Sequence, residues 1–81
     1  MQLTSNNNSI IAFPNPFSNN ITAKLDLNST VEVVSIDGKT VFQSEAKAGE
    51  INLNTENWNN GIYIMKIKNS KGTSIQKLIK Q

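Results

Sequence analysis

The sequence contains no cysteine and no histidine, only two prolines and four glycines, and lysine is its sole basic residue type. The first two absences exclude a disulfide, a thiolate nucleophile, an imidazole base and most transition-metal sites. Catalysis would have to rest on carboxylates, lysines or hydroxyls. The acidic residues are Asp26, Glu32, Asp37, Glu45, Glu50 and Glu56. None of them shows the spacing of a catalytic pair or of a calcium loop, so we expect no enzymatic activity and no cofactor.

The charge pattern argues against a nucleic-acid or membrane partner. Eight lysines and six acidic residues give a net charge of +2, and the lysines alternate with apolar residues, as in Lys66-Ile67-Lys68. Nucleic-acid binders cluster their basic residues on one element and favour arginine for bidentate contacts. No apolar run approaches the roughly 20 residues that a membrane-spanning helix requires. We therefore expect no nucleic-acid binding and no membrane insertion.

Short apolar runs, separated by segments rich in asparagine, serine and threonine, predict seven strands. They cover residues 10–13, 21–27, 31–36, 40–46, 51–53, 62–68 and 73–80. In the second run, apolar residues alternate with polar ones, which places its four apolar side chains on a core face. These are Ile21, Ala23, Leu25 and Leu27. Short strands without a helical stripe predict an all-β fold, an antiparallel immunoglobulin-like β-sandwich. We assign it to residues 10–81 and expect the asparagine-rich residues 1–9 to form a flexible linker.

Asp37-Gly38 is the dipeptide that favours positive φ at both central positions of a two-residue type I′ hairpin turn. This turn predicts the cross-strand pairs Val34–Val41 and Val33–Phe42. Each face of the hairpin would then carry an apolar pair. Because one face must lie in the core, we expect the other to be only partly covered.

Pro14-Asn15-Pro16 fixes two φ angles and removes two backbone donors. The segment therefore predicts a stiff, extended corner that starts a strand at a sheet edge. Phe13 and Phe17 flank the corner, and we expect both rings to anchor it in the core.

Trp58 and Tyr63 are the residues that a sugar-binding site would use, because aromatic faces stack on pyranose rings. Tyr63, however, alternates with Met65 and Ile67, which predicts a core position with the hydroxyl at its rim. The alternative interpretation of the whole chain stays open at this point. It is an immunoglobulin-like or fibronectin-like accessory module that binds polysaccharide or spaces domains in a cell-surface enzyme.

Four motifs occur in order along most of the chain. They are Phe13-Pro14-Asn15-Pro16-Phe17, Asp37-Gly38-Lys39, Gly49-Glu50-Ile51-Asn52-Leu53 and the apolar hairpin of residues 61–80. In this order they resemble the type A C-terminal sorting domain of cargo proteins of the type IX secretion system, found in bacteria of the Bacteroidota type. Trp58 stands where that family usually has leucine, which predicts a core plug, and Gln81 follows the terminal lysine.

The resemblance implies a non-catalytic secretion signal at the end of a larger exported protein. The cargo domain would precede it in the same polypeptide, travel to the periplasm and pass through the outer-membrane translocon. Shuttle and surface peptidase components of the machinery would be further partners, and proteolytic removal would leave the cargo released or attached to the cell surface. The positions that match the family's sorting motif are Pro14, Asn15, Pro16, Gly61, Tyr63, Gly72, Lys77, Leu78, Ile79 and Lys80, with Gly38 and Gly49 in structural roles.

The signal proper is expected in residues 77–80, at the end of the last predicted strand, residues 73–80. A strand at the chain end is expected to lie at a sheet edge with unpaired backbone N–H and C=O groups. Such an edge can be recognised by strand addition. The hypothesis from sequence is that the machinery recognises this edge together with Lys77 and Lys80.

Overall fold

Seven strands run through the part of the chain that a computed structural model describes, residues 12–14 and 16–81. They are β2 (Ala12–Phe13), β3 (Asn20–Leu25), β4 (Ser29–Ser35), β5 (Thr40–Ala46), β6 (Gly49–Asn54), β7 (Gly61–Asn69) and β8 (Gly72–Lys80). Each overlaps one of the predicted runs. Within these residues there is no helix of the length and apolarity needed to cross a membrane. The predicted linker at residues 1–9 and the start of the first predicted strand lie outside the described residues.

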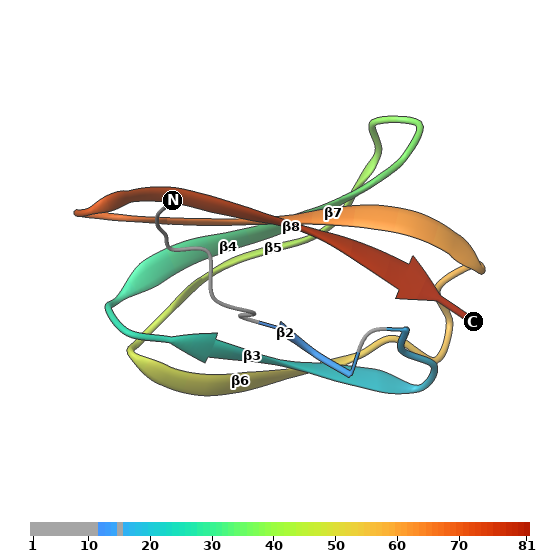
Figure 1. Ribbon diagram of the computed structural model, residues 1–81, viewed down its shortest axis with the longest axis horizontal. Helices are drawn as coiled ribbons and strands as arrows, with labels where there is room; N and C mark the ends of the chain where they lie inside the picture. Colours follow the sequence, from blue (N-terminus) through green and yellow to red (C-terminus); the bar gives the residue numbers. More distant parts are fainter. Residues whose placement is uncertain (1–11, 15) are drawn as a thin grey trace, which may run out of the picture.

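The strands form two antiparallel sheets that face each other, as Figure 1 shows. One sheet has three strands in the order β2-β3-β6, and the other has four in the order β5-β4-β7-β8. The chain changes sheet after β3, after β5 and after β6, so each sheet contains strands from both halves of the sequence. The prediction of an all-β antiparallel sandwich is confirmed.

One face of each sheet turns inward, because side chains along a strand point alternately to opposite sides. The buried apolar residues are Ala12, Phe17, Ile21, Ala23, Leu25, Val31, Val33, Leu53, Tyr63, Met65, Ile67 and Leu78. The predicted core face of β3 is confirmed for three of its four residues. Leu27 is the exception: it follows the end of β3 and is half-buried. There the chain turns toward β4, and the Leu27 carbonyl accepts a hydrogen bond of 2.7 Å from the Ser29 hydroxyl.

The turn between β4 and β5 differs from the predicted two-residue turn. The Ser35 N–H donates to the Lys39 carbonyl (2.8 Å), and the Gly38 N–H donates to the Ser35 carbonyl (2.9 Å). The loop therefore holds three residues, and Gly38 closes it with φ at 92°. A three-residue loop that ends in a left-handed glycine places a bulge next to the turn.

The three-residue loop shifts the pairing next to the turn by one residue, and the register returns to the predicted one between Val34 and Val33, where β5 carries Val41 as an extra residue. Val33 pairs with Phe42 as predicted, but Val34 pairs with Thr40, and the predicted partner Val41 is wrong. Val33 is fully buried, Val34 is half-buried and Val41 is 38% exposed. The expectation of one core face and one partly covered face is thus confirmed.

The prediction that the proline corner, residues 14–16, starts an edge strand is wrong. The corner follows the edge strand β2. The Phe13–Pro14 peptide bond is cis. Phe17 anchors the corner in the core as predicted, at 1% exposure, but the prediction for Phe13 is wrong. Phe13 is 40% exposed, and its ring lies 5.7 Å from the Lys24 ammonium nitrogen. In the two-residue strand only one side chain can face inward, and that one is Ala12.

Candidate functional site

The candidate signal residues at the chain end lie on β8, an edge strand of the four-stranded sheet. Their side chains alternate across the sheet. Leu78 (0% exposed) and Lys80 (7%) face the core, whereas Lys77 and Ile79 (37%) face outward. The Lys80 ammonium donates to the backbone oxygen of Gln81 at 3.4 Å. The two lysines that the sequence grouped together therefore lie on opposite faces of the strand.

A one-residue bridge covers the end of this edge strand. Phe17 pairs in parallel with Lys80. The Phe17 N–H donates to the Ile79 carbonyl (2.8 Å), and the Gln81 N–H donates to the Phe17 carbonyl (2.8 Å). The prediction of unpaired backbone groups along β8 is wrong at this end, because the chain returns from the proline corner to lie beside it.

A second link joins β8 to β2, the edge strand of the other sheet. The Gln76 amide nitrogen donates to the Ala12 carbonyl (3.0 Å), and the Gln76 amide oxygen accepts from the Ala12 N–H (3.1 Å). One side chain thus satisfies both backbone groups of Ala12 in a partly buried position. The two sheets are thereby connected at their edges as well as through the core.

Three aromatic rings pack together near the end of β8. The Trp58 ring centroid lies 5.8 Å from that of Phe17, nearly perpendicular to it, and 5.1 Å from that of Tyr63. Tyr63 is 4% exposed, as predicted, and its hydroxyl donates to the Asn59 carbonyl at 2.6 Å. Trp58 is half-buried against the core, in agreement with its predicted role as a plug. A ring buried like that of Tyr63 offers no face on which a sugar could stack.

The remaining candidates lie in turns and corners. Gly61 begins β7 at a φ of 147°, and Gly72 begins β8 at 133°, values that residues with a Cβ rarely adopt. Pro14 and Pro16 are exposed, and Asn15 lies outside the described residues. The structure gathers Pro16, Gly61, Tyr63 and the end of β8 around Phe17. Gly72 lies apart from this group, at the other end of the β7–β8 hairpin.

Sequence reasoning missed Thr55, which is fully buried. Its N–H donates to the Asn19 carbonyl (3.0 Å), its hydroxyl donates to the Ser18 carbonyl (2.9 Å), and its carbonyl accepts from the Trp58 N–H (3.0 Å). Thr55 therefore fastens the segment after Phe17 to the turn that carries Trp58. A single threonine in a polar segment gives no pattern from which this position could be found.

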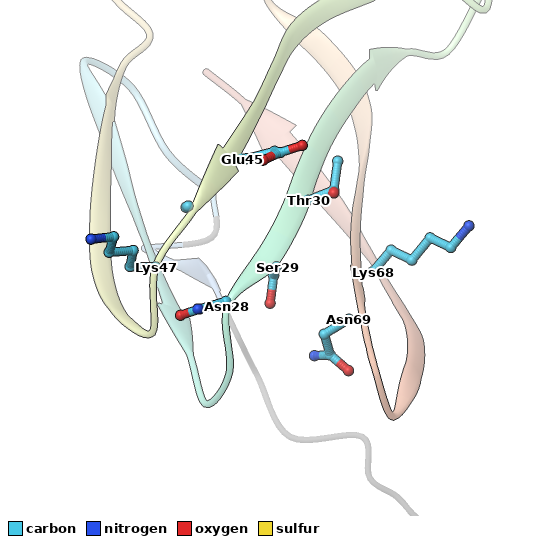
Figure 2. A pocket seen from close by; sticks show the side chains of 8 residues that line it. Asn28, Ser29, Thr30, Glu45, Lys47, Lys68 and Asn69 are labelled. Carbon is cyan, nitrogen blue, oxygen red and sulfur yellow. The ribbon is translucent and has the colours of Figure 1, made fainter.

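A hollow of about 570 Å³ lies where the turns after β3, β5 and β7 meet. Its charged lining residues are Glu45, Lys47 and Lys68. Figure 2 shows the two lysine side chains pointing away from the hollow in opposite directions. Within residues 12–14 and 16–81, no three acidic side chains cluster as a metal site would require. The hollow thus brings together no set of groups suited to catalysis or to cation binding.

One carboxyl group has a pKa moved from its ordinary value. A hydrogen bond from the Ser35 hydroxyl lowers the pKa of Asp37, with the nearby Lys39 ammonium adding to the effect. Asp37 is fully exposed at the β4–β5 turn. A lowered pKa keeps this group ionised, which is the opposite of what a general acid needs.

The comparisons with known proteins agree with this architecture. The chain is similar to part of the solved structure of PorZ, an essential bacterial surface component of the type-IX secretion system of Porphyromonas gingivalis, with a TM-score of 0.76. Sequence identity is 18%, and the match covers 86% of this chain and 11% of PorZ, so it shows a shared fold alone. No curated protein matches the sequence. The family model described as "Secretion system C-terminal sorting domain" matches residues 11–81, and the chain therefore belongs to that family.

Proposed function

We propose that this domain directs a periplasmic cargo protein through the outer-membrane translocon of the type IX secretion system. The observation that carries the proposal is the family match, which extends over residues 11–81 and includes the whole β7–β8 hairpin. The cargo precedes the domain in the same polypeptide. Removal by a surface peptidase then leaves the cargo released or attached at the cell surface.

Residues 77–80 are the proposed signal proper. Two of them have a structural role, and the other two are accessible to a partner. Leu78 and Lys80 are buried, so they hold β8 in the sandwich. Lys77 and Ile79 face outward, where a translocon or shuttle component can contact them. Deleting the segment would therefore remove core packing and recognition together. A substitution on the outward side alone separates the two.

A reporter with a signal peptide, fused upstream of Met1 and produced in a type IX-competent bacterium, tests the proposal. The parent fusion is expected outside the cell or on its surface. Lys77→Glu reverses an exposed charge without touching the core, and we expect several-fold more reporter to stay in the periplasm. Lys47→Glu makes the same change in the turn after β5 and serves as the matched control.

The outcomes separate the two parts of the proposal. A parent fusion that never leaves the periplasm would show that the sorting assignment is wrong. Export of Lys77→Glu at the level of the parent would instead place the signal away from Lys77.

A further inference from the structure

Six aliphatic side chains lie together on the outer face of the four-stranded sheet, near its β4–β5 turn. We name this surface the aliphatic patch: Val34, Ile36, Val41, Ile62, Ile64 and Ile79. Val34 pairs with Ile64, and Ile62 pairs with Ile79. Val41 lies at the bulge beside Val34, and the Ile36 N–H donates to the Ile62 carbonyl at 3.0 Å. The patch therefore crosses all four strands.

The patch is accessible to a partner. Ile36 is 69% exposed, and Val41, Ile62 and Ile79 are 37 to 38% exposed. Figure 1 shows the β4–β5 turn extending beyond this sheet on the side away from the other sheet. Contiguous exposed apolar surface on a small domain marks an interaction site more often than scattered single residues do.

The charges at the border indicate what kind of surface would fit. Lys77 on β8 pairs with Ile64 on β7. The next outward residue of β7 after Ile64 is Lys66, which pairs with Glu32 on β4. Glu32 accepts a hydrogen bond from the Thr40 hydroxyl, and Asp37 at the turn accepts one from Ser35. The acidic groups at this border are thus already hydrogen-bonded within the chain. These hydroxyl donors leave both carboxylates charged, but Lys39 lies near Asp37. The border therefore holds three lysines against two carboxylates, and its net positive charge favours carboxylates on a partner.

The chemistry of the patch fits a protein surface better than a lipid one. Tryptophan and tyrosine are the side chains enriched at membrane–water interfaces. Here Trp58 and Tyr63 pack on each other and on Phe17, away from the patch. Aliphatic, β-branched side chains on the outer face of a sheet suit packing against another protein's apolar side chains.

We propose that the aliphatic patch is the docking face for a protein component of the secretion machinery whose contact surface has an aliphatic centre and a carboxylate border. This inference rests on the proposed function and extends it. The terminal segment contributes Ile79 to the patch and Lys77 to its border, and β4, β5 and β7 contribute the rest. The machinery thus recognises a folded face of the sandwich, of which the chain end is one part.

The test uses the same reporter fusion with all 81 residues. The double variant Ile62→Thr/Ile79→Thr replaces one cross-strand pair with polar, β-branched residues that keep strand propensity. We expect export to fall about tenfold, the scale set by losing central interface contacts. Ile75→Thr makes the same change on the same face of β8, at a 65% exposed position opposite Lys66 and beyond the aliphatic side chains of the patch, and should leave export unchanged.

Two further variants keep the test independent of folding and of the terminal segment. Ile36→Thr changes the most exposed patch residue, in the turn, and replaces the double variant if that one unfolds. Lys66→Glu reverses a border charge on β7 and should lower export several-fold. Circular dichroism on each purified chain selects variants whose thermal midpoints lie within about 5 °C of the parent, roughly 1 kcal/mol for a domain of this size.

Each outcome supports or overturns the inference. If the parent fusion is not exported, the proposed function fails first. If the parent is exported and folded patch variants are exported equally well, the docking face is wrong while the function stands. Patch-dependent dimers of the purified chain in sedimentation velocity, or patch-dependent flotation with anionic phospholipid vesicles, would identify a second copy or a lipid surface and overturn a protein partner from the machinery.

Discussion

The two outer faces of the sandwich differ in chemistry at the end of the four-stranded sheet that lies near the β4–β5 turn. On the three-stranded sheet, the outward pairs of β3 and β6 are polar throughout: Asn20–Asn54, Thr22–Asn52 and Lys24–Glu50. On the four-stranded sheet, the outward pairs include Val34–Ile64 and Ile62–Ile79. Inside the sandwich the two sheets are alike, since both contribute aliphatic side chains to one core.

The difference shows which apolar residues the fold requires. A half-buried antiparallel sheet needs apolar residues on its inner face only. The three-stranded sheet follows this rule in β3 and β6. Its exception is the edge residue Phe13, which is 40% exposed and has the Lys24 ammonium 5.7 Å from its ring. The aliphatic patch is not required by this rule, because its side chains lie on the outer face, add little to the core and expose apolar surface. Because the fold does not explain why these outer positions are apolar, binding of a partner is the better explanation.

Adjacent residues of β8 give the sharpest contrast between core and patch. Leu78→Ala is expected to lower the free energy of unfolding by about 2–5 kcal/mol, because it leaves a cavity in the core. Ile79→Ala removes a partly exposed side chain and should cost about 1 kcal/mol or less. Urea denaturation of both variants measures the difference. Equal losses would mean that the patch is a structural surface and would weaken its assignment as a docking face.

The sequence predicted the local pattern of both faces well. Alternation within β3 identified Ile21, Ala23 and Leu25 as inward-facing, because a period of two is set by the strand itself. The same reasoning anticipated that the β4–β5 hairpin has a second, partly covered apolar face. It failed at Leu27, where the strand had already ended, and at Val41, where a bulge shifts the register.

Contacts between distant segments could not be predicted in the same way. The Phe17–Lys80 bridge and the hydrogen bonds of Gln76 to Ala12 join residues more than 60 positions apart. Thr55 is buried because it meets residues 18 and 19 in space. No periodicity encodes these contacts, since they depend on how the two sheets meet. The hypothesis of an open β8 edge failed at residues 79–81 for that reason, whereas the outward position of Lys77 followed from alternation.

Threonine hydroxyls allow a second comparison, between the core and the polar outer face. Thr55→Val removes the hydrogen bond from a buried hydroxyl to the Ser18 carbonyl. It should cost about 0.5–1.5 kcal/mol, because Ser18 is exposed and water can replace the lost donor. Thr22→Val removes an exposed hydrogen bond to Asn52 and should change stability by no more than about 0.5 kcal/mol. Thermal unfolding followed by circular dichroism measures both. A large loss at Thr22 would show that the polar outer face has a structural role.

The smallest expected effect concerns Asp37, the acidic group in the turn that flanks the aliphatic patch. The Ser35 hydrogen bond lowers the pKa of Asp37 below its ordinary value of 3.8. A carboxyl whose pKa is lower in the folded state stabilises that state above the unfolded pKa, and the contribution is lost as pH falls through the folded value. The parent should therefore be slightly more stable than Asp37→Asn at pH 7, and the difference should vanish as the pH falls below about 3.8. Ser35→Ala should reduce this pH dependence without abolishing it, because Lys39 also lowers the pKa of Asp37. Thermal midpoints measured between pH 7 and pH 2 test both variants. Because Asp37 is already bonded to its own chain, Asp37→Asn should also leave export of the reporter unchanged. A clear loss of export at an unchanged thermal midpoint would show that the partner binds this carboxylate, and would require a basic border on the partner in place of the acidic one inferred from Lys66 and Lys77.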